Sequence, residues 1–254
     1  MRARELLKSA IRRLTASGSP DPEADAKWLL SDALRVHRGA LPLRLDDDLA
    51  GDDLEWFEKA LSRRESGEPL QYVEGFAAFY GRQFKVDPRV LIPRSDTETL
   101  CEAALGRVRP GMRALDLCTG SGILAILSLM FGAKKAVGTD LDPCAVEAVK
   151  ENCESNGISP KNFEMMIGNI ITDTTVQDKV GYDCYDIVVA NILADVLVPL
   201  TPVIVNQLKK GGIYITSGII DDKEQTVVEA VKKAGLEILE ITYQGEWVSV
   251  TARK

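Results

Sequence analysis

The chain has 254 residues, enough for one large domain or for a small domain followed by a larger one. Its composition is ordinary for a soluble globular protein, and its net charge of −7 argues against direct nucleic-acid binding, which favours a basic surface. An acidic surface suits a basic protein partner instead. No apolar run is long enough to span a bilayer and the N-terminus does not resemble a signal peptide, so we expect no membrane association.

The cysteine and histidine content points to a reducing compartment and away from metal chemistry. Five cysteines are present, an odd number without metal-ligand spacing, which fits the cytoplasm. The single histidine, His37, lies far along the chain from the glycine-rich motif described below. We therefore expect a cytoplasmic monomer without a metal site.

The first part of the chain has the pattern of a small helical bundle. Apolar residues recur at helical spacing over residues 2–16, 23–37 and 54–64, and the segment 19–22 contains two prolines that separate the first two helices. We predict a helical domain over residues 1–66. A bundle of this size binds or positions a partner more often than it catalyses a reaction.

Residues 67–95 predict a β-hairpin and a linker. Aromatic residues and alternation over 68–75 and 79–86 favour paired strands. The segment 90–98 follows, and we expect it to lead into a helix that starts near Asp96.

A strand, a glycine turn and a helix follow one another over residues 112–130. Ala114 to Leu117 predict a buried strand that contains Asp116, Cys118–Gly122 form a turn of small residues, and 123–130 predict a helix. Glycines in such a turn let the backbone approach a ligand at the helix N-terminus. An acid on the strand would repel a phosphate but attract an ammonium group, which S-adenosylmethionine carries.

The ends of the next three strands supply further polar residues. Asp140 ends a strand over 135–139, twenty residues after Gly120, where an acid suits a bidentate bond to ribose hydroxyls. Asn169 follows a strand over 163–167 and could accept a bond from an adenine amino group, although a turn-capping role is a nearly equal alternative. The predicted cofactor-binding residues are Asp116, Cys118, Thr119, Gly120, Ser121, Gly122, Asp140, Leu141, Asn169, Ile170 and Asn191.

The remaining pattern completes a doubly wound α/β domain over residues 96–254. A fourth strand over 185–190 ends at Asn191, and further elements are predicted as helices over 143–156, 197–209 and 224–234 and strands over 213–217, 236–243 and 246–252. For the glycine turn and Asp140, the alternative to cofactor binding is a generic Rossmann-like turn in which the Asp only caps the turn. The ensemble resembles the class I S-adenosylmethionine-dependent methyltransferases, which implies a Rossmann-like seven-stranded sheet and S-adenosyl-L-methionine as cofactor.

A second resemblance covers roughly residues 1–125. The stretches 68–75, 79–86 and 90–98 resemble the release-factor glutamine methyltransferases, in which a helical N-terminal domain and such a hairpin precede the catalytic domain. This resemblance implies that residues 1–66 dock a protein substrate, and it implies a glutamine amide as the methyl acceptor.

The loop after the fourth strand departs from that family. The resemblance leads us to expect Asn-Pro-Pro-Tyr, whereas this chain has Asn191, Ile192, Leu193 and Ala194. This loop, with the stretches 168–171, 217–221 and 245–248, resembles the methyltransferases that modify the eleventh protein of the large ribosomal subunit, over roughly residues 130–254. Those enzymes methylate amines.

The two resemblances agree on a methyltransferase that acts on a protein nitrogen in the translation apparatus. The sequence prediction favours the glutamine amide of release factors, with an amine of the ribosomal protein as the alternative; an inactive cofactor-binding protein is a third possibility. Asn191 is the predicted catalytic residue, and the predicted substrate-binding residues are Asn191, Ile192, Leu193 and Ala194. Ile192 and Leu193 could equally well only pack beneath the site.

Overall fold

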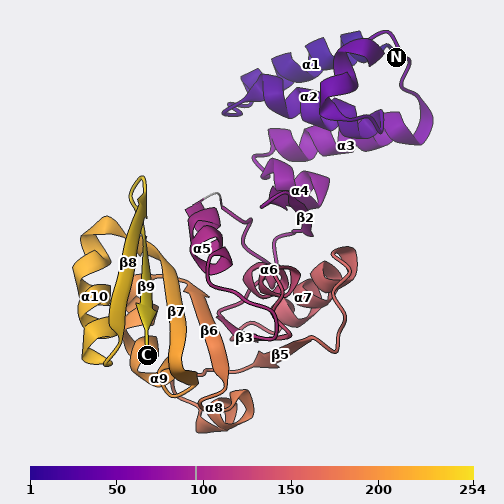
Figure 1. Cartoon of the computed structure of the whole chain (residues 1–254). Coiled ribbons are helices and arrows are strands. Elements are labelled where there is room, and N and C mark those ends of the chain that lie inside the picture. Colours follow the sequence, from indigo (N-terminus) through magenta and orange to yellow (C-terminus); the bar gives the residue numbers. More distant parts are fainter. Residues whose placement is uncertain (95) are drawn as a thin grey trace. The chain divides into compact units, whose positions relative to one another are not determined.

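A computed structural model describes residues 1–94 and 96–254, so Ser95, the last residue of the predicted linker, lies outside the described residues. The chain divides into two compact units, Met1–Phe76 and Ala77–Lys254, which Figure 1 shows in a single colour ramp from indigo to yellow. Among the described residues, no helix is long and apolar enough to cross a bilayer.

The first unit is a helical bundle with its own apolar core. Its elements are α1 (Ala3–Ala16), α2 (Pro22–Ala33), the 3-10 helix η1 (Arg38–Arg44), α3 (Gly51–Glu65) and α4 (Leu70–Glu74). Leu6, Leu14, Leu29 and Phe57 are fully or almost fully buried, because their helical spacing places them on the inner faces of α1, α2 and α3.

The first unit differs from the sequence prediction in two places. The helix predicted over 23–37 ends at Ala33, since Arg35 adopts the left-handed conformation (φ 54°), and the 3-10 helix η1 begins separately at Arg38. Residues 70–74, expected in a strand, form α4, which ends at Gly75 in the left-handed conformation (φ 81°).

The boundary between the units falls at the start of a β-hairpin, and the second unit continues as an alternation of strands and helices. The hairpin pairs β1 (Phe76–Phe79) with β2 (Arg82–Lys85). The elements that follow are α5 (Asp96–Leu105), β3 (Arg113–Leu117), α6 (Ile123–Met130), β4 (Lys135–Asp140), α7 (Cys144–Ser155), β5 (Phe163–Ile167), α8 (Thr174–Val180), β6 (Tyr185–Asn191), α9 (Ala194–Ile204), β7 (Leu208–Ile220), η2 (Asp221–Lys223), α10 (Glu224–Lys233), β8 (Glu237–Gln244) and β9 (Trp247–Arg253).

Seven strands within the described residues form one sheet in the order β5-β4-β3-β6-β7-β9-β8. The pairs from β5 through β7 are parallel, and β9 runs antiparallel to both β7 and β8. The chain winds outward from β3 to β5 and then returns to β6 on the other side of β3. The carboxyl ends of β3 and β6 therefore flank the switch point of the sheet, where open α/β sheets bind ligands.

Helices cover both faces of this sheet, so the second unit has three layers (Figure 1). Residues of α5, α6 and α7 form an apolar cluster with one face, and residues of α8, α9 and α10 form another cluster with the opposite face. Because β3 and β6 are buried on both faces, their sequences are continuous apolar runs with few interruptions. Asp116 is a notable exception in β3.

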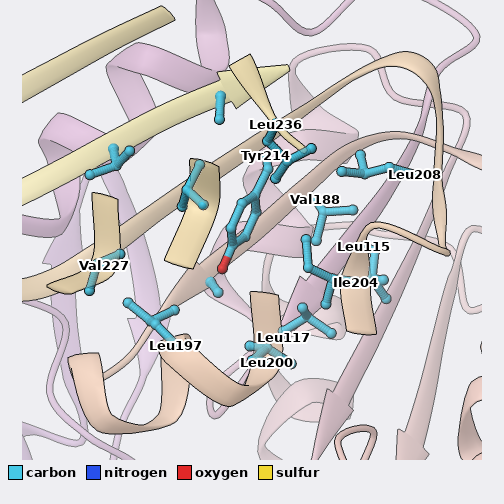
Figure 2. Close-up of a cluster of buried hydrophobic side chains, with 14 of the residues drawn as sticks. Leu115, Leu117, Val188, Leu197, Leu200, Ile204, Leu208, Tyr214, Val227 and Leu236 are labelled. Carbon is cyan, nitrogen blue, oxygen red and sulfur yellow. The ribbon is translucent and has the colours of Figure 1, made fainter. Parts of the chain in front are cut away.

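The second cluster contains Tyr214, one of the largest fully buried side chains (Figure 2). Figure 2 shows Leu197 and Leu200 of α9 beneath the Tyr214 ring, with Leu117 and Val188 from the central strands nearby. This packing holds the central strands against α9, the helix that follows the loop after Asn191.

Two further predictions about the second unit need correction. The helix predicted over 197–209 ends at Ile204, and β7 begins at Leu208, five residues before the predicted strand start. Helix α8 was not predicted, because its seven residues include the polar run Thr174–Thr175 and give too short a helical pattern to recognise.

We predict that Leu197→Ala lowers the free energy of unfolding by about 2–5 kcal/mol, since the substitution removes buried methyl groups and leaves a cavity in the cluster of Figure 2. Leu239→Ala is the matched control, because Leu239 is 38% exposed and should change stability by only about 0.5 kcal/mol. Urea unfolding followed by circular dichroism measures both. Equal losses in the two variants would contradict this account of the core.

Candidate active site

The turn between β3 and α6 depends on residues in the left-handed conformation. Cys118, Gly120 and Gly122 have φ values of 57°, 50° and 79°. A Cβ on Gly122 would lie 2.9 Å from Val149 Cγ2 and 3.2 Å from the Phe163 ring, so only glycine fits there. A Cβ on Gly120 would meet nothing within 4 Å, so this part of the turn leaves room for a ligand.

Asp116 is a buried acid with one unsatisfied oxygen. Its side chain is 1% exposed, and Oδ2 accepts hydrogen bonds from the Thr119 hydroxyl and from the Ala125 N–H at 3.1 Å. Oδ1 is buried without a hydrogen-bond partner in the described structure. Burial, which removes water from the charged form, raises the pKa of Asp116 to about 7.

The end of β4 is joined to the glycine turn through Asp140. Asp140 Oδ2 accepts the Gly120 N–H at 2.8 Å, and Oδ1 accepts the Asp142 N–H at 3.0 Å. Each carboxylate oxygen retains a further lone pair for another donor. Leu141, the next residue, is 64% exposed.

The residues after β5 take up turn and core positions. Asn169 Oδ1 accepts the Ile171 N–H at 3.0 Å, which is the turn-capping arrangement. Ile170 is 6% exposed and belongs to the apolar cluster around Tyr214. Neither residue lines the two depressions described next. The turn that contains them nevertheless lies beside the end of β4, because the Gly168 N–H donates to the Asp140 carbonyl at 2.9 Å.

A solvent-open depression of about 510 Å³ lies over the glycine turn. Its wall contains Asp116, the turn residues 118–121, Asn191, the segment 91–94 and Thr97. Burial raises the pKa of Cys118 to about 12, so its thiol is neutral near pH 7 and offers an uncharged surface. The predicted residues of β3, its turn and β6 are thus brought together at the switch point.

The two polar atoms of the Asn191 carboxamide differ in their hydrogen bonding. Its Nδ2 donates to Thr97 Oγ1 at 2.8 Å, and Thr97 is 5% exposed at the start of α5. Its Oδ1 accepts no hydrogen bond within the described part of the chain. The sequence analysis missed Thr97, which lies 94 residues from Asn191 and carries no local signal of this contact.

A second depression of about 920 Å³ shares several wall residues with the first. Asp140, Leu141 and Gly218 line it, as do the loop residues Ile192 and Leu193. Leu193 is 66% exposed, so it is not a core residue. Ala194 differs from the prediction, because it starts α9 and its methyl group is buried in the apolar cluster rather than in the wall.

Two further wall residues come from distant segments. The Arg94 guanidinium lies 4.2 Å from the centroid of the Trp247 ring and 3.0 Å from an Asp96 oxygen. Both Arg94 and Trp247 line the second depression. Trp247 lies in the stretch 245–248, which carries part of the resemblance to the ribosomal-protein methyltransferases. Nothing in the sequence pairs it with Arg94.

The geometry therefore combines a buried acid, a glycine turn, a second acid on the next strand and a carboxamide that lines both depressions. This set can hold a nucleoside with a cationic end and can present an acceptor to a donor group of a second molecule. No group of three or more His, Cys, Asp or Glu side chains among the described residues could hold a metal ion.

Two family models match this chain. Residues 95–254 match the model described as "Ribosomal protein L11 methyltransferase (PrmA)". Residues 5–75 match the model of the "PrmC N-terminal domain". The two matches fall on different units of the structure.

Similar proteins agree with the first model. The ribosomal protein L11 methyltransferase of Lachnospira eligens is 55% identical over 148 residues, which are 58% of this chain and 46% of that protein. The protein of the same name from Agathobacter rectalis is 47% identical over 176 residues, 67% of this chain and 54% of its own length. The chain thus spans about half the length of the curated relatives it matches.

Solved structures confirm the predicted class I methyltransferase fold. The ribosomal protein L11 methylase of Lactobacillus delbrueckii subsp. bulgaricus has a TM-score of 0.59 at 28% identity and covers 70% of this chain and 90% of that one. The structure described as a "putative methyltransferase complexed with SAH" has a TM-score of 0.61 at 11% identity and covers 79% of this chain and 66% of that one. At this identity it supports the fold alone.

Asp116 gives a prediction on the pH dependence of stability. Its pKa of about 7 in the folded state exceeds the roughly 4 expected in the unfolded chain, so the folded state binds the proton more tightly. This contribution to stability is present below about pH 4 and is lost as the pH rises through about 7. Asp116→Asn should therefore gain unfolding free energy relative to the unmodified protein between about pH 5 and pH 8. Urea unfolding at several pH values measures the unfolding free energy of both proteins. An equal change with pH in the two would refute the raised pKa of Asp116.

Proposed function

The chain belongs to the ribosomal protein L11 methyltransferase family, and from that membership we propose that it transfers a methyl group from S-adenosylmethionine to an amine nitrogen of a protein. Ribosomal protein L11, the substrate named for the relatives, is the proposed acceptor. The observation that carries the proposal is the carboxamide of Asn191, which lines the depression over the glycine turn and whose Oδ1 accepts no hydrogen bond within the described residues.

The residues around the first depression fit this cofactor. The unsatisfied Oδ1 of Asp116 would accept the ammonium group, whose charge favours the ionised carboxylate. The open side of Gly120 admits the methionine portion, and the remaining lone pairs of Asp140 suit the two ribose hydroxyls. Bound there, the cofactor supplies a methyl group on a positively charged sulfur.

The loop after β6 favours an amine over an amide as the acceptor. An amide nitrogen is a poor nucleophile, because its lone pair is delocalised, whereas an amine becomes nucleophilic once a proton leaves. Asn191 Oδ1 can accept one N–H and orient the nitrogen for in-line attack, in which the C–N bond forms as the S–C bond breaks. Ile192 and Leu193 add no side-chain acceptor and lack the rigidity of proline, so little beside Asn191 would orient an amide.

A release factor is the second candidate substrate, because residues 5–75 match the PrmC N-terminal domain. In this alternative the first unit docks the release factor and the second methylates its glutamine amide. The named relatives do not support the glutamine specificity that the sequence analysis favoured. The docking role of the first unit remains our proposal for either substrate.

We predict that Asp140→Ala weakens S-adenosylhomocysteine binding, since charge-assisted hydrogen bonds contribute on the order of 1.5–3 kcal/mol each, or roughly tenfold or more in affinity. Asp142→Ala is the matched control, because its carboxylate caps Cys144 two residues away and does not line the depressions. Titration calorimetry measures both variants. An unchanged affinity in Asp140→Ala would remove Asp140 from the cofactor site.

The proposed function is tested by S-adenosylhomocysteine release with ribosomal protein L11 and, separately, with a release factor. Preference for L11 supports amine methylation, and preference for the release factor supports the second candidate. Cofactor binding without methylation of either protein would favour the inactive cofactor-binding alternative and would contradict the proposal.

The role of the first unit is tested with a chain that starts at Ala77, the first residue of the second unit. Because the residues proposed for the cofactor lie within Ala77–Lys254, we expect its S-adenosylhomocysteine affinity to stay nearly the same and its protein methylation to fall sharply. Circular dichroism verifies that the shortened chain is folded. Methylation at the full rate would show that the first unit does not dock the substrate.

A further inference from the structure

Gly218 occupies an irregular position of β7 beside the end of β6. The pairing of β7 with β9 shifts register between Thr216 and Ile219, so Gly218 lies within a bulge of the strand. Its φ of 79° lies in the left-handed region, and it lines the second depression. Bulges next to active sites commonly redirect a neighbouring side chain.

The space beside Gly218 is filled by the loop that contains Asn191. A Cβ at this position would lie 2.9 Å from Asn191 Oδ1 and 3.0 Å from both the backbone N and O of Ile192. The Ile192 N–H donates to the Ser217 carbonyl at 3.1 Å, so the Ile192 backbone is fixed next to the bulge. The missing side chain of Gly218 therefore determines how near to β7 the Asn191 oxygen can lie.

Asn191 cannot move away from an added methyl group without breaking its other contact. Its Nδ2 is held by Thr97 Oγ1 at 2.8 Å, and Thr97 is buried on α5. A rotation that moves Oδ1 away from residue 218 also turns Nδ2 relative to Thr97, because the two atoms belong to one planar group.

We propose that Gly218 is a positioning residue for methyl transfer, which fixes the direction of the Asn191 carboxamide oxygen from the side opposite Thr97. This inference rests on the proposed function of Asn191 as the acceptor of a substrate N–H. Gly218 acts only through Asn191 and the Ile192 backbone, so its replacement should alter the rate of the chemical step more than the binding of the cofactor.

The test compares Gly218→Ala with Gly211→Ala. Gly211 lies in the same strand and has the same φ of 79°, but a Cβ on it would meet nothing within 4 Å. Both variants therefore bear the same strain of a left-handed alanine, and only Gly218→Ala places a methyl group against Asn191. Circular dichroism and S-adenosylhomocysteine binding verify that each variant is folded.

The first measurement does not depend on activity. In a ¹H–¹⁵N spectrum of the full chain, the side-chain NH2 signals of Asn191 are identified by their loss in Asn191→Ala. We expect Gly218→Ala to shift these signals and Gly211→Ala to leave them in place. Unshifted signals in Gly218→Ala would overturn the inference, whether or not the chain methylates any protein.

The second measurement is kinetic and uses whichever of ribosomal protein L11 and the release factor the unmodified chain methylates. Gly218→Ala should lower kcat on the order of 10- to 100-fold, as expected for a misplaced catalytic group, with the KM for S-adenosylmethionine changed less than about twofold. In an Asn191→Ala background, the same substitution should cost almost nothing further, because the group it displaces is already gone.

The outcomes separate this inference from the proposed function. Shifted Asn191 signals in a chain that methylates neither protein would reject the proposed function and retain the placement of Asn191 by Gly218. Shifted signals with an unchanged kcat, or additive losses in the double variant, would overturn the positioning role. If Gly218→Ala does not fold, folding of the double variant supports the contact with Asn191. If neither variant folds, the added methyl group acts on the Ile192 backbone instead, and the positioning of the Asn191 oxygen by Gly218 is rejected.

Discussion

The buried carboxylate of Asp116 is the interaction on which the site depends. One of its oxygens binds both the Thr119 hydroxyl and the Ala125 N–H, and so it joins the glycine turn to the first turn of α6. The same arrangement leaves its second oxygen without a partner. The fold thus keeps a carboxyl group with a raised pKa at the centre of the unit, and a cationic ligand would provide the missing interaction.

The site is distributed over strands that the topology brings together. Asp116, Asp140 and Asn191 come from β3, β4 and β6, which are neighbours in the sheet and parallel to one another. Their carboxyl ends therefore lie at one edge, and the Gly120–Asp140 hydrogen bond joins the first two directly. The antiparallel β9 adds Trp247 from the far end of the chain, which a purely parallel sheet would not place there.

The parts that the sequence predicted well are those with a strong local pattern. Strands β3, β4 and β6 are mostly apolar runs with a polar residue at or next to their carboxyl ends, so both the strands and the grouping of Asp116, Asp140 and Asn191 could be inferred. The boundary between α9 and β7 could not, because residues 205–212 are compatible with a helix end or a strand start. The roles of Thr97 and Arg94 could not be inferred, because their partners lie 94 and 153 residues away and only tertiary contacts reveal such pairs.

The place where the two family resemblances meet has a structural counterpart. The match to the PrmC N-terminal domain ends at residue 75, and the first compact unit ends at Phe76. The hairpin that follows belongs to the second unit, since the Asn152 side chain accepts the Lys85 N–H at 2.6 Å and donates to the Lys85 carbonyl at 3.1 Å.

Asn152 also connects this hairpin to the glycine turn between β3 and α6. Its Nδ2 lies 3.2 Å from the Ser121 carbonyl, and the residue is completely buried. One side chain of α7 thus holds both β2 and the turn between β3 and α6. The hairpin, which precedes the match to the L11 methyltransferase family, is therefore an integral part of the second unit.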